Sequence, residues 1–242
     1  MKIFTIFLTL TLFINAKTIN IAVAANASSV IDELISYYKQ EHKEISFNKF
    51  IGSSGKLSAQ IINGAPYDIF LSANKEYPNN LEKRGLGVEK PKIYAKGTLA
   101  IFSIKDYNIS LNTLSSAQIE KIAIANPKTA PYGEAAKEAL QKANLYTKLK
   151  PKFIYGESIG QTLTFTLKAA DIGLVAKSQL FSKDLSKYKE GKNWIELDKS
   201  LYKPISQAMI LLNKDVEVEK FYNFLSSKEA KNIFKKFGYI EE

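Results

Sequence analysis

The chain has 242 residues, of which 45% are hydrophobic and 24% charged, and its formal net charge is +10 at pH 7. This composition is that of a globular protein, large enough for one big domain or two smaller lobes. The chain contains no cysteine, which excludes disulfides, thiolate zinc sites and a cysteine nucleophile. Its lysines are scattered and form no basic block, so we do not expect nucleic acid among its partners.

Residues 1–16 have the pattern of a secretory signal peptide. Lys2 precedes an apolar run from Ile3 to Ile14, and Asn15-Ala16 ends the segment with a small residue. A run of this length is too short to span a bilayer comfortably. We therefore expect a cleaved leader, a mature chain that begins near Lys17, and a periplasmic protein that is not anchored to the membrane.

Strand-like and helical patterns alternate along the rest of the chain, which predicts an α/β fold with largely parallel sheets. Apolar residues alternate within residues 18–25 and then recur at helical spacing from Val30 to Tyr38. Further strands are expected at 45–51, 67–73, 99–104, 121–125, 152–155, 172–176 and 208–212. Further helices are expected at 57–62, 133–143 and 159–168, with one or two more within 218–237.

Two similar strand–helix series predict two lobes, each with a mostly parallel sheet flanked by helices. We assign residues 17–96 and 207–242 to the first lobe and residues 97–206 to the second. The chain then crosses between the lobes twice, near Lys96-Gly97 and near Ile205–Gln207. Paired crossovers make a hinge, and closure about a hinge is a common response to a ligand.

Four junctions between a strand and a helix share one chemistry of small side chains, free N–H groups and a hydroxyl or amide. They are 24–29, 52–55, 129–133 and 157–160. The first N–H groups of a helix lack an intrahelical partner and lie at the positive end of its dipole, so they bind anions. Any one junction could be a simple helix cap. Four of them, two from each lobe, favour an anion site in the cleft between the lobes.

The charged residues of these junctions are few. Lys56 is their only cation, and we expect it to be solvated or packed on its helix. The absence of Arg favours a small, compact and fully enclosed dianion held by neutral donors. The direction of Glu157 is open at this point, and so is the choice between a site of donors only and one that includes an acceptor.

Enzyme functions find little support in the chain. His42 is the single histidine and lies in a polar stretch far from the four junctions, so no Ser-His-Asp arrangement can be assembled. No cluster of His, Asp and Glu has the spacing of metal ligands. Asp68 and Asp171, each just before an apolar strand, are expected to be structural.

Several stretches together resemble the periplasmic molybdate-binding proteins of ABC importers, over nearly the whole mature chain. They are 22–26, GSSGKLSAQIINGAPYDIFLSA at 52–73, NPKTAPYGEAAKEAL at 126–140, GESIGQT at 156–162 and ADIGLVAKSQL at 170–180. The resemblance implies a two-lobed periplasmic-binding-protein fold, no enzymatic activity and no cofactor. It implies oxyanion contacts at Asn26, Ser54, Tyr132 and Ile159, with Ala25 adjacent.

Within that resemblance, Ile159 contributes a main-chain N–H, and Ser54 contributes its hydroxyl and its N–H. These contacts go to the oxygens of the oxyanion, so no residue is a direct metal ligand. The chain departs from some relatives, which have Ser in place of Asn26 and Tyr in place of Ala176. Tyr132 then supplies the tyrosine of the site.

The resemblance implies that the protein binds molybdate or tungstate and delivers it, as a monomer, to a membrane permease with its ATPase. The main alternative is a sulfate- or phosphate-binding protein of an ABC importer. The same fold also serves as a sensing domain of transcription regulators, which would need a DNA-binding helix-turn-helix that residues 1–16 cannot make. A secreted hydrolase is the remaining alternative.

Overall fold

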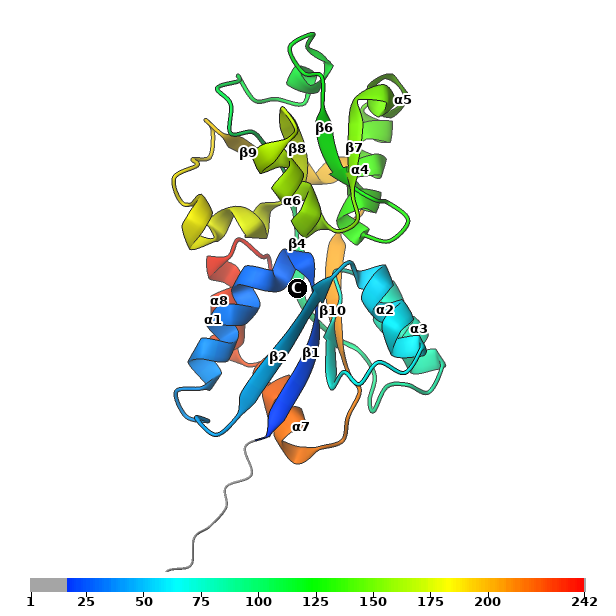
Figure 1. Ribbon diagram of the computed structural model, residues 1–242, viewed down its shortest axis with the longest axis vertical. Coiled ribbons are helices and arrows are strands. Elements are labelled where there is room, and N and C mark those ends of the chain that lie inside the picture. Colours follow the sequence, from blue (N-terminus) through cyan, green and yellow to red (C-terminus); the bar gives the residue numbers. More distant parts are fainter. Residues whose placement is uncertain (1–16, 242) are drawn as a thin grey trace, which may run out of the picture.

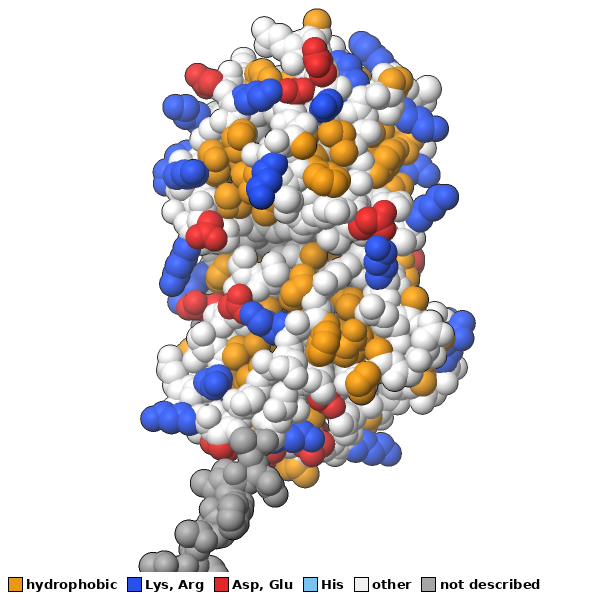
Figure 2. Space-filling model, in the orientation of Figure 1, with side chains coloured by type: hydrophobic (Ala, Val, Ile, Leu, Met, Phe, Trp, Pro, Cys, Tyr) orange, Lys and Arg blue, Asp and Glu red, His pale blue; other side chains and the backbone are white. Residues whose placement is uncertain are grey.

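The computed structural model describes residues 17–241, so the predicted signal peptide lies outside the described residues. The described chain forms two lobes stacked along its longest axis, each built on a five-stranded sheet (Figure 1). Lys and Arg side chains are spread over both lobes with acidic side chains among them, and no single-sign block covers the face in Figure 2. The predicted α/β class and two-lobed architecture are confirmed.

The first sheet has the strand order β2-β1-β3-β10-β4, in which β10 alone runs against the other strands. The bounds are β1 (Thr18–Ala24), β2 (Ser46–Gly52), β3 (Ile69–Leu71), β4 (Lys92–Gly97) and β10 (Ile205–Leu211). The register between β10 and β4 shifts after Gln207, so that Tyr94 has no partner on β10. This is a β-bulge, a device that re-aims side chains next to functional sites.

Helices cover both faces of the first sheet, which explains why its strands read as apolar runs. Ile21, Val23 and Met209 pack under α1 (Ser28–Tyr38), α7 (Val216–Phe224) and α8 (Lys228–Lys236). Ala22, Phe70 and Ile210 face the other way, toward α2 (Ser54–Ile62) and α3 (Glu76–Lys83). Because successive side chains of a strand point to opposite faces, this one sheet contributes to two hydrophobic cores.

The second sheet has the order β7-β6-β8-β5-β9, and here β5 runs against the others. The bounds are β5 (Leu99–Phe102), β6 (Ile122–Ala125), β7 (Phe153–Gly156), β8 (Ile172–Ala176) and β9 (Trp194–Glu196). Residues such as Ile101 and Ile124 pack against α4 (Pro131–Lys142), while Phe102 and Val175 pack on the face of α6 (Ile159–Lys168). The short helix α5 (Tyr146–Leu149) follows α4.

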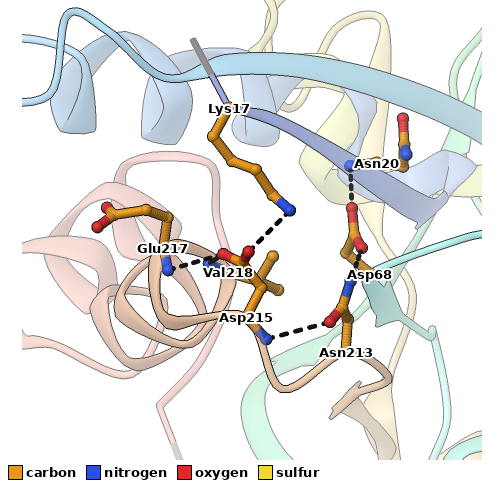
Figure 3. A network of polar contacts seen from close by, with 7 residues as sticks. All are labelled: Lys17, Asn20, Asp68, Asn213, Asp215, Glu217 and Val218. Atoms are coloured by element: carbon orange, nitrogen blue, oxygen red, sulfur yellow. Dashed lines mark hydrogen bonds and ion pairs between the residues drawn. The ribbon is translucent and has the colours of Figure 1, made fainter. Parts of the chain in front are cut away.

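The start of the described chain contacts the start of α7, a helix near the other end of the sequence (Figure 3). Lys17 Nζ lies 2.9 Å from Asp215 Oδ2, and Asp215 also caps the first turn of α7. Asp68 accepts hydrogen bonds from the main-chain N–H of Asn20 at 2.7 Å and from the amide of Asn213 at 2.6 Å. Asp68 is therefore structural, as predicted, and the first and last segments form one lobe.

The chain passes from one sheet to the other twice, between β4 and β5 and between β9 and β10. The exact lobe boundaries at 96/97 and 206/207 stay a prediction. Two strands, β4 and β9, and the helices α3 and α5 were not predicted, whereas the segment 218–237 divides into the two helices α7 and α8. Within residues 17–241, no helix is long and apolar enough to cross a membrane.

Candidate oxyanion site

A small cavity lies where the four predicted junctions meet between the lobes. Its walls come from η1 (Ala25–Ala27), from the turn before α2 and from the first residues of α4 and α6. The lining residues are Ala24, Ala25, Asn26, Gly52, Ser53, Ser54, Ala73, Ala130, Pro131, Tyr132 and Ile159. None of these side chains is charged, so this cavity is neutral apart from the dipoles around it.

The five residues predicted for the site, Ala25, Asn26, Ser54, Tyr132 and Ile159, all line this one cavity. Two lie on η1, and the other three lie in the first turns of α2, α4 and α6. Main-chain N–H groups in a first turn have no intrahelical acceptor, and three helix dipoles present their positive ends here. The cavity therefore offers N–H donors to an anion without offering a cation.

The two serines at the start of α2, Ser53 and Ser54, differ in the hydrogen bonds of their hydroxyls. Ser54 Oγ accepts a hydrogen bond from the main-chain N–H of Ala73 at 2.9 Å, which leaves its own hydrogen free. Ser53 Oγ is buried and has no hydrogen-bond partner in the described chain. Sequence reasoning named Ser54 alone, although the Gly-Ser-Ser-Gly turn carries both hydroxyls. Ser53 is thus an additional donor at the cavity wall.

Asn26 is held from three sides. Its amide nitrogen donates to Gln207 Oε1 at 2.8 Å and to the Tyr239 hydroxyl at 2.9 Å. Its main-chain carbonyl accepts from Ser178 Oγ at 3.0 Å and from Tyr239 at 3.1 Å. Its amide oxygen is buried without a partner among the described residues. Because both amide hydrogens are already used, the donor that Asn26 keeps for an anion is its main-chain N–H.

Tyr132 is 1% exposed, and its hydroxyl oxygen accepts a hydrogen bond from Gln207 Nε2 at 3.1 Å. Burial raises the pKa of Tyr132 well above its ordinary value, and the nearby Tyr239 adds to this effect. The phenol therefore stays protonated at neutral pH, as a neutral hydrogen-bond donor.

The lobes touch each other around the cavity, so this is a closed arrangement. The N–H of Gly55 in α2 donates to the carbonyl of Thr129 in the other lobe at 3.0 Å. Lys56 Nζ lies 2.8 Å from Glu157 Oε2, also across the lobes. Lys56 is half exposed and does not contact the cavity, in agreement with the expectation of a solvated side chain, and it also makes an ion pair that the sequence did not reveal. Neither residue lines the cavity, which settles the direction of Glu157.

The residues that were not expected to belong to the site lie away from the cavity. His42 stacks on Tyr38 with 4.1 Å between ring centroids, far from the four junctions. Asp171 accepts from the main-chain N–H groups of Glu120 and Lys121 at 2.9 and 2.8 Å, which makes it structural, as predicted. In the part of the chain that the structure describes, no three His, Asp or Glu residues are placed to hold a metal ion.

The family model described as bacterial extracellular solute-binding protein matches residues 19–240. The chain belongs to this family. Proteins of this family bind solutes, which agrees with the expectation that the chain is not an enzyme. The match includes every junction that lines the cavity.

The chain is similar to proteins named for molybdate. It is 33% identical to the molybdate-binding protein ModA of Rhodobacter capsulatus over 94% of each chain. It is 34% identical to ModA of Azotobacter vinelandii, over 93% of this chain and 90% of that protein. The solved periplasmic molybdate-binding protein of A. vinelandii superposes with a TM-score of 0.85 at 28% identity, covering 93% and 99% of the two chains. The resemblance to molybdate-binding proteins is confirmed.

The fold is shared more widely than the ligand. The sulfate-binding protein SubI of Mycobacterium tuberculosis superposes with a TM-score of 0.73 but is 13% identical, covering 92% of this chain and 86% of that one. At this identity the likeness concerns the fold alone. The identity of the solute must therefore be argued from the cavity of this solute-binding protein.

Three residues that sequence reasoning missed belong to this site, namely Ser178, Gln207 and Tyr239. They lie far apart in the chain, and each contacts Asn26. One local signal was present, because Gln207 is a polar side chain directly before the apolar run Ala208–Leu211 of β10. The other two have no signal that a single sequence could reveal.

Proposed function

We propose that this protein binds molybdate between its lobes and delivers it to the permease and ATPase of an ABC importer. The observation that carries the proposal is the uncharged cavity at which three helix N-termini and η1 converge from both lobes. Relatives named molybdate-binding proteins, 33 and 34% identical over more than nine tenths of the chain, support the choice of anion.

The proposed contacts are the main-chain N–H groups of Asn26 and Ile159, the hydroxyl and N–H of Ser54, and the Tyr132 hydroxyl, with Ala25 adjacent. A fully deprotonated tetrahedral dianion accepts hydrogen bonds at every oxygen and therefore suits these donors. The oxygens of the anion meet the protein, and the metal atom at its centre has no protein ligand. Since the donors come from both lobes, a bound anion stabilises the closed arrangement over the open one.

Tungstate is nearly the same size and shape as molybdate, so we propose that it binds to the same donors. Sulfate has the same charge but is smaller. In a cage built for the larger anion, sulfate would leave some buried donors unpaired, and each unpaired donor costs about 1–3 kcal/mol. The relatives do not favour sulfate or phosphate binding, the alternative that the sequence left open, and the experiment below tests it.

We further propose that residues 1–16 are cleaved on export and that the mature protein works as a monomer in the periplasm, without a membrane anchor. The apolar run after Lys2 supports export. The mass of the mature protein purified from periplasm, determined by mass spectrometry, and its size in solution test both points.

The experiment is a calorimetric titration of residues 17–242 with molybdate, tungstate, sulfate and phosphate, accompanied by thermal unfolding. At a 100-fold excess over Kd, a ligand that binds only the folded protein stabilises it by about 2.7 kcal/mol. For a chain of this size that raises Tm by roughly 5–10 °C. We expect this rise with molybdate and tungstate alone. An equal rise with sulfate would contradict selection by size, and no rise with any of the four would end the proposal.

A further inference from the structure

We propose that Gln207 is a positioning residue of the oxyanion site, which holds Asn26 in place and turns the hydroxyl hydrogen of Tyr132 toward the anion. This inference rests on the proposed function. Gln207 does not line the cavity itself, so its effect on the anion is transmitted through the two residues that do.

Gln207 is completely buried, and a buried amide is costly unless its polar atoms are paired. Its oxygen lies 2.8 Å from the amide nitrogen of Asn26 and 2.8 Å from the hydroxyl of Tyr94. Its nitrogen lies 3.1 Å from the hydroxyl oxygen of Tyr132. Every polar atom of the side chain is thus occupied by a named partner, which fixes the amide in one orientation.

That orientation decides what Tyr132 can do. An amide nitrogen only donates, so the Tyr132 oxygen must accept in this contact. A phenol has one hydrogen, and within the described chain no hydrogen bond donated by the Tyr132 hydroxyl is formed, although the Ser178 hydroxyl lies close enough to affect the pKa of Tyr132. The Tyr132 hydrogen is therefore available to an oxygen of the anion. A carbonyl or carboxylate in place of the Gln207 nitrogen would take that hydrogen and remove one donor from the site.

Two features of the backbone allow Gln207 and Tyr132 to contact each other in this orientation. A Cβ atom built on Gly97 would overlap the hydroxyl of Tyr132 and the amide nitrogen of Gln207, so the two side chains meet only because residue 97 has none. The bulge in β4 opposite Gln207 leaves Tyr94 unpaired with β10, and the Tyr94 hydroxyl then reaches the Gln207 oxygen. Both features lie where β4 ends and β10 begins, near the second lobe.

The contact also joins the lobes. Gln207 belongs to β10 of the first sheet, whereas Tyr132 belongs to α4, which packs on the second sheet. The hydrogen bond between them is available only when the lobes are close together. Gln207 therefore completes the donor set of the site as the lobes close, and its loss should act mainly on the dissociation rate of the anion.

The test is a double-mutant cycle on molybdate affinity, with the variants Gln207→Met, Tyr132→Phe and the double variant. Methionine has a similar length and no hydrogen-bonding amide. We expect Gln207→Met to weaken binding about 10-fold or more alone and by a clearly smaller factor when Tyr132 is already Phe, because only the effect through Asn26 then persists. A residue that merely supports the fold would weaken binding equally in both backgrounds.

A matched control is Gln179→Met, in the same cycle. Gln179 is also buried, but its amide holds the carbonyl of Ile159 at 3.3 Å and the N–H of Ala176 at 3.2 Å, with no contact to Tyr132. Its effect on affinity should be the same with Tyr132 or with Phe at that position. If Gln207→Met does not fold, the cycle is run with Gln207→Asn, whose shorter amide cannot reach both Asn26 and Tyr132.

The outcomes separate this inference from the function on which it rests. Molybdate binding by the unmodified protein, with equal effects of Gln207→Met in both backgrounds, would overturn the positioning of Tyr132 and leave the proposed function standing. No molybdate binding by the unmodified protein would overturn both. Coupling between residues 207 and 132, together with no coupling between 179 and 132, would establish the role.

Discussion

The ammonium nitrogen of Lys56 lies 2.8 Å from a carboxylate oxygen of Glu157, and this ion pair joins the two lobes beside the cavity. Lys56 is the third residue of α2 and Glu157 comes two residues before α6, so the helices that face the cavity also carry the pair. Both side chains are about half exposed, at 53% and 54%. The pair can break without burying a charge, which suits a contact that must open to release the solute.

We expect Glu157→Gln to raise the dissociation rate of molybdate about 2- to 5-fold with little change in the association rate. An exposed ion pair is worth up to about 1 kcal/mol and is screened by salt, so the effect should shrink at high ionic strength. Stopped-flow measurement at low and high salt tests this. Glu217→Gln is the control, because Glu217 pairs with Lys220 within α7 at 2.7 Å. An effect of equal size in the control would remove the interlobe explanation.

We expect Gly97→Ala to lower molybdate affinity at least about 10-fold. The new methyl group would overlap Tyr132 and Gln207, and neither can move without breaking its hydrogen bonds. Gly85→Ala provides the comparison, since Gly85 has φ of +73° and no neighbour near its missing Cβ. That change strains the backbone by about 1–2 kcal/mol and should lower Tm without altering affinity. Calorimetry and thermal unfolding of both variants separate the two effects.

We expect alanine substitutions of the two serines at the start of α2 to affect stability and binding differently. Ser54→Ala removes the acceptor of the buried Ala73 N–H, so it should lower stability by about 1–3 kcal/mol as well as weaken binding. Ser53→Ala removes a hydroxyl that has no protein partner, so it should weaken binding and leave stability unchanged. Denaturant unfolding without ligand and titration with molybdate measure each effect. A stability loss confined to Ser53→Ala would contradict this assignment.

Asp171 predicts a pH dependence of stability. Burial opposes its charge, but Lys105 and the N–H groups of Lys121 and Glu120 outweigh burial and lower the pKa of Asp171. A carboxyl whose pKa is lowered by folding stabilises the folded state above its unfolded pKa, and this contribution disappears as the pH falls through the folded pKa. Asp171→Asn should therefore cost about 1–2 kcal/mol at pH 7 and progressively less below about pH 4.

Urea unfolding of the Asp171→Asn variant from pH 7 to pH 3 provides the measurement. Asp106→Asn is the control, because Asp106 is an exposed residue of the loop after β5. It should leave the free energy of unfolding nearly unchanged over the whole range. A loss at Asp171 that does not depend on pH would show that the aspartate acts through its shape alone.

The four strand-to-helix junctions could be predicted from sequence because their chemistry is local. Small residues and hydroxyls such as Ser54 stand directly before helical patterns, and the topology of parallel strands brings such junctions to one edge. The helix 159–168 and the strand 172–176 have the expected bounds, since their periodicity is strong over their full length.

Other features are decided by tertiary structure. The helix α3 contains Pro78 and two asparagines, which individually disfavour helix, and it is stabilised by burial of Leu81. The strand β4 carries lysines at both ends, so its pattern is weak. Gln207 stands in an apolar strand, and nothing local tells whether its amide meets Asn26, Tyr132 or a structural group. Such a partnership exists only in three dimensions.

Tyr239 holds the carboxamide of Asn26 across 213 positions of sequence. Because synthesis starts at the N-terminus, Asn26 is made long before Tyr239, the residue that helps to orient its amide. A chain that stopped before Tyr239 would therefore lack one of the two partners that orient the Asn26 amide at the cavity.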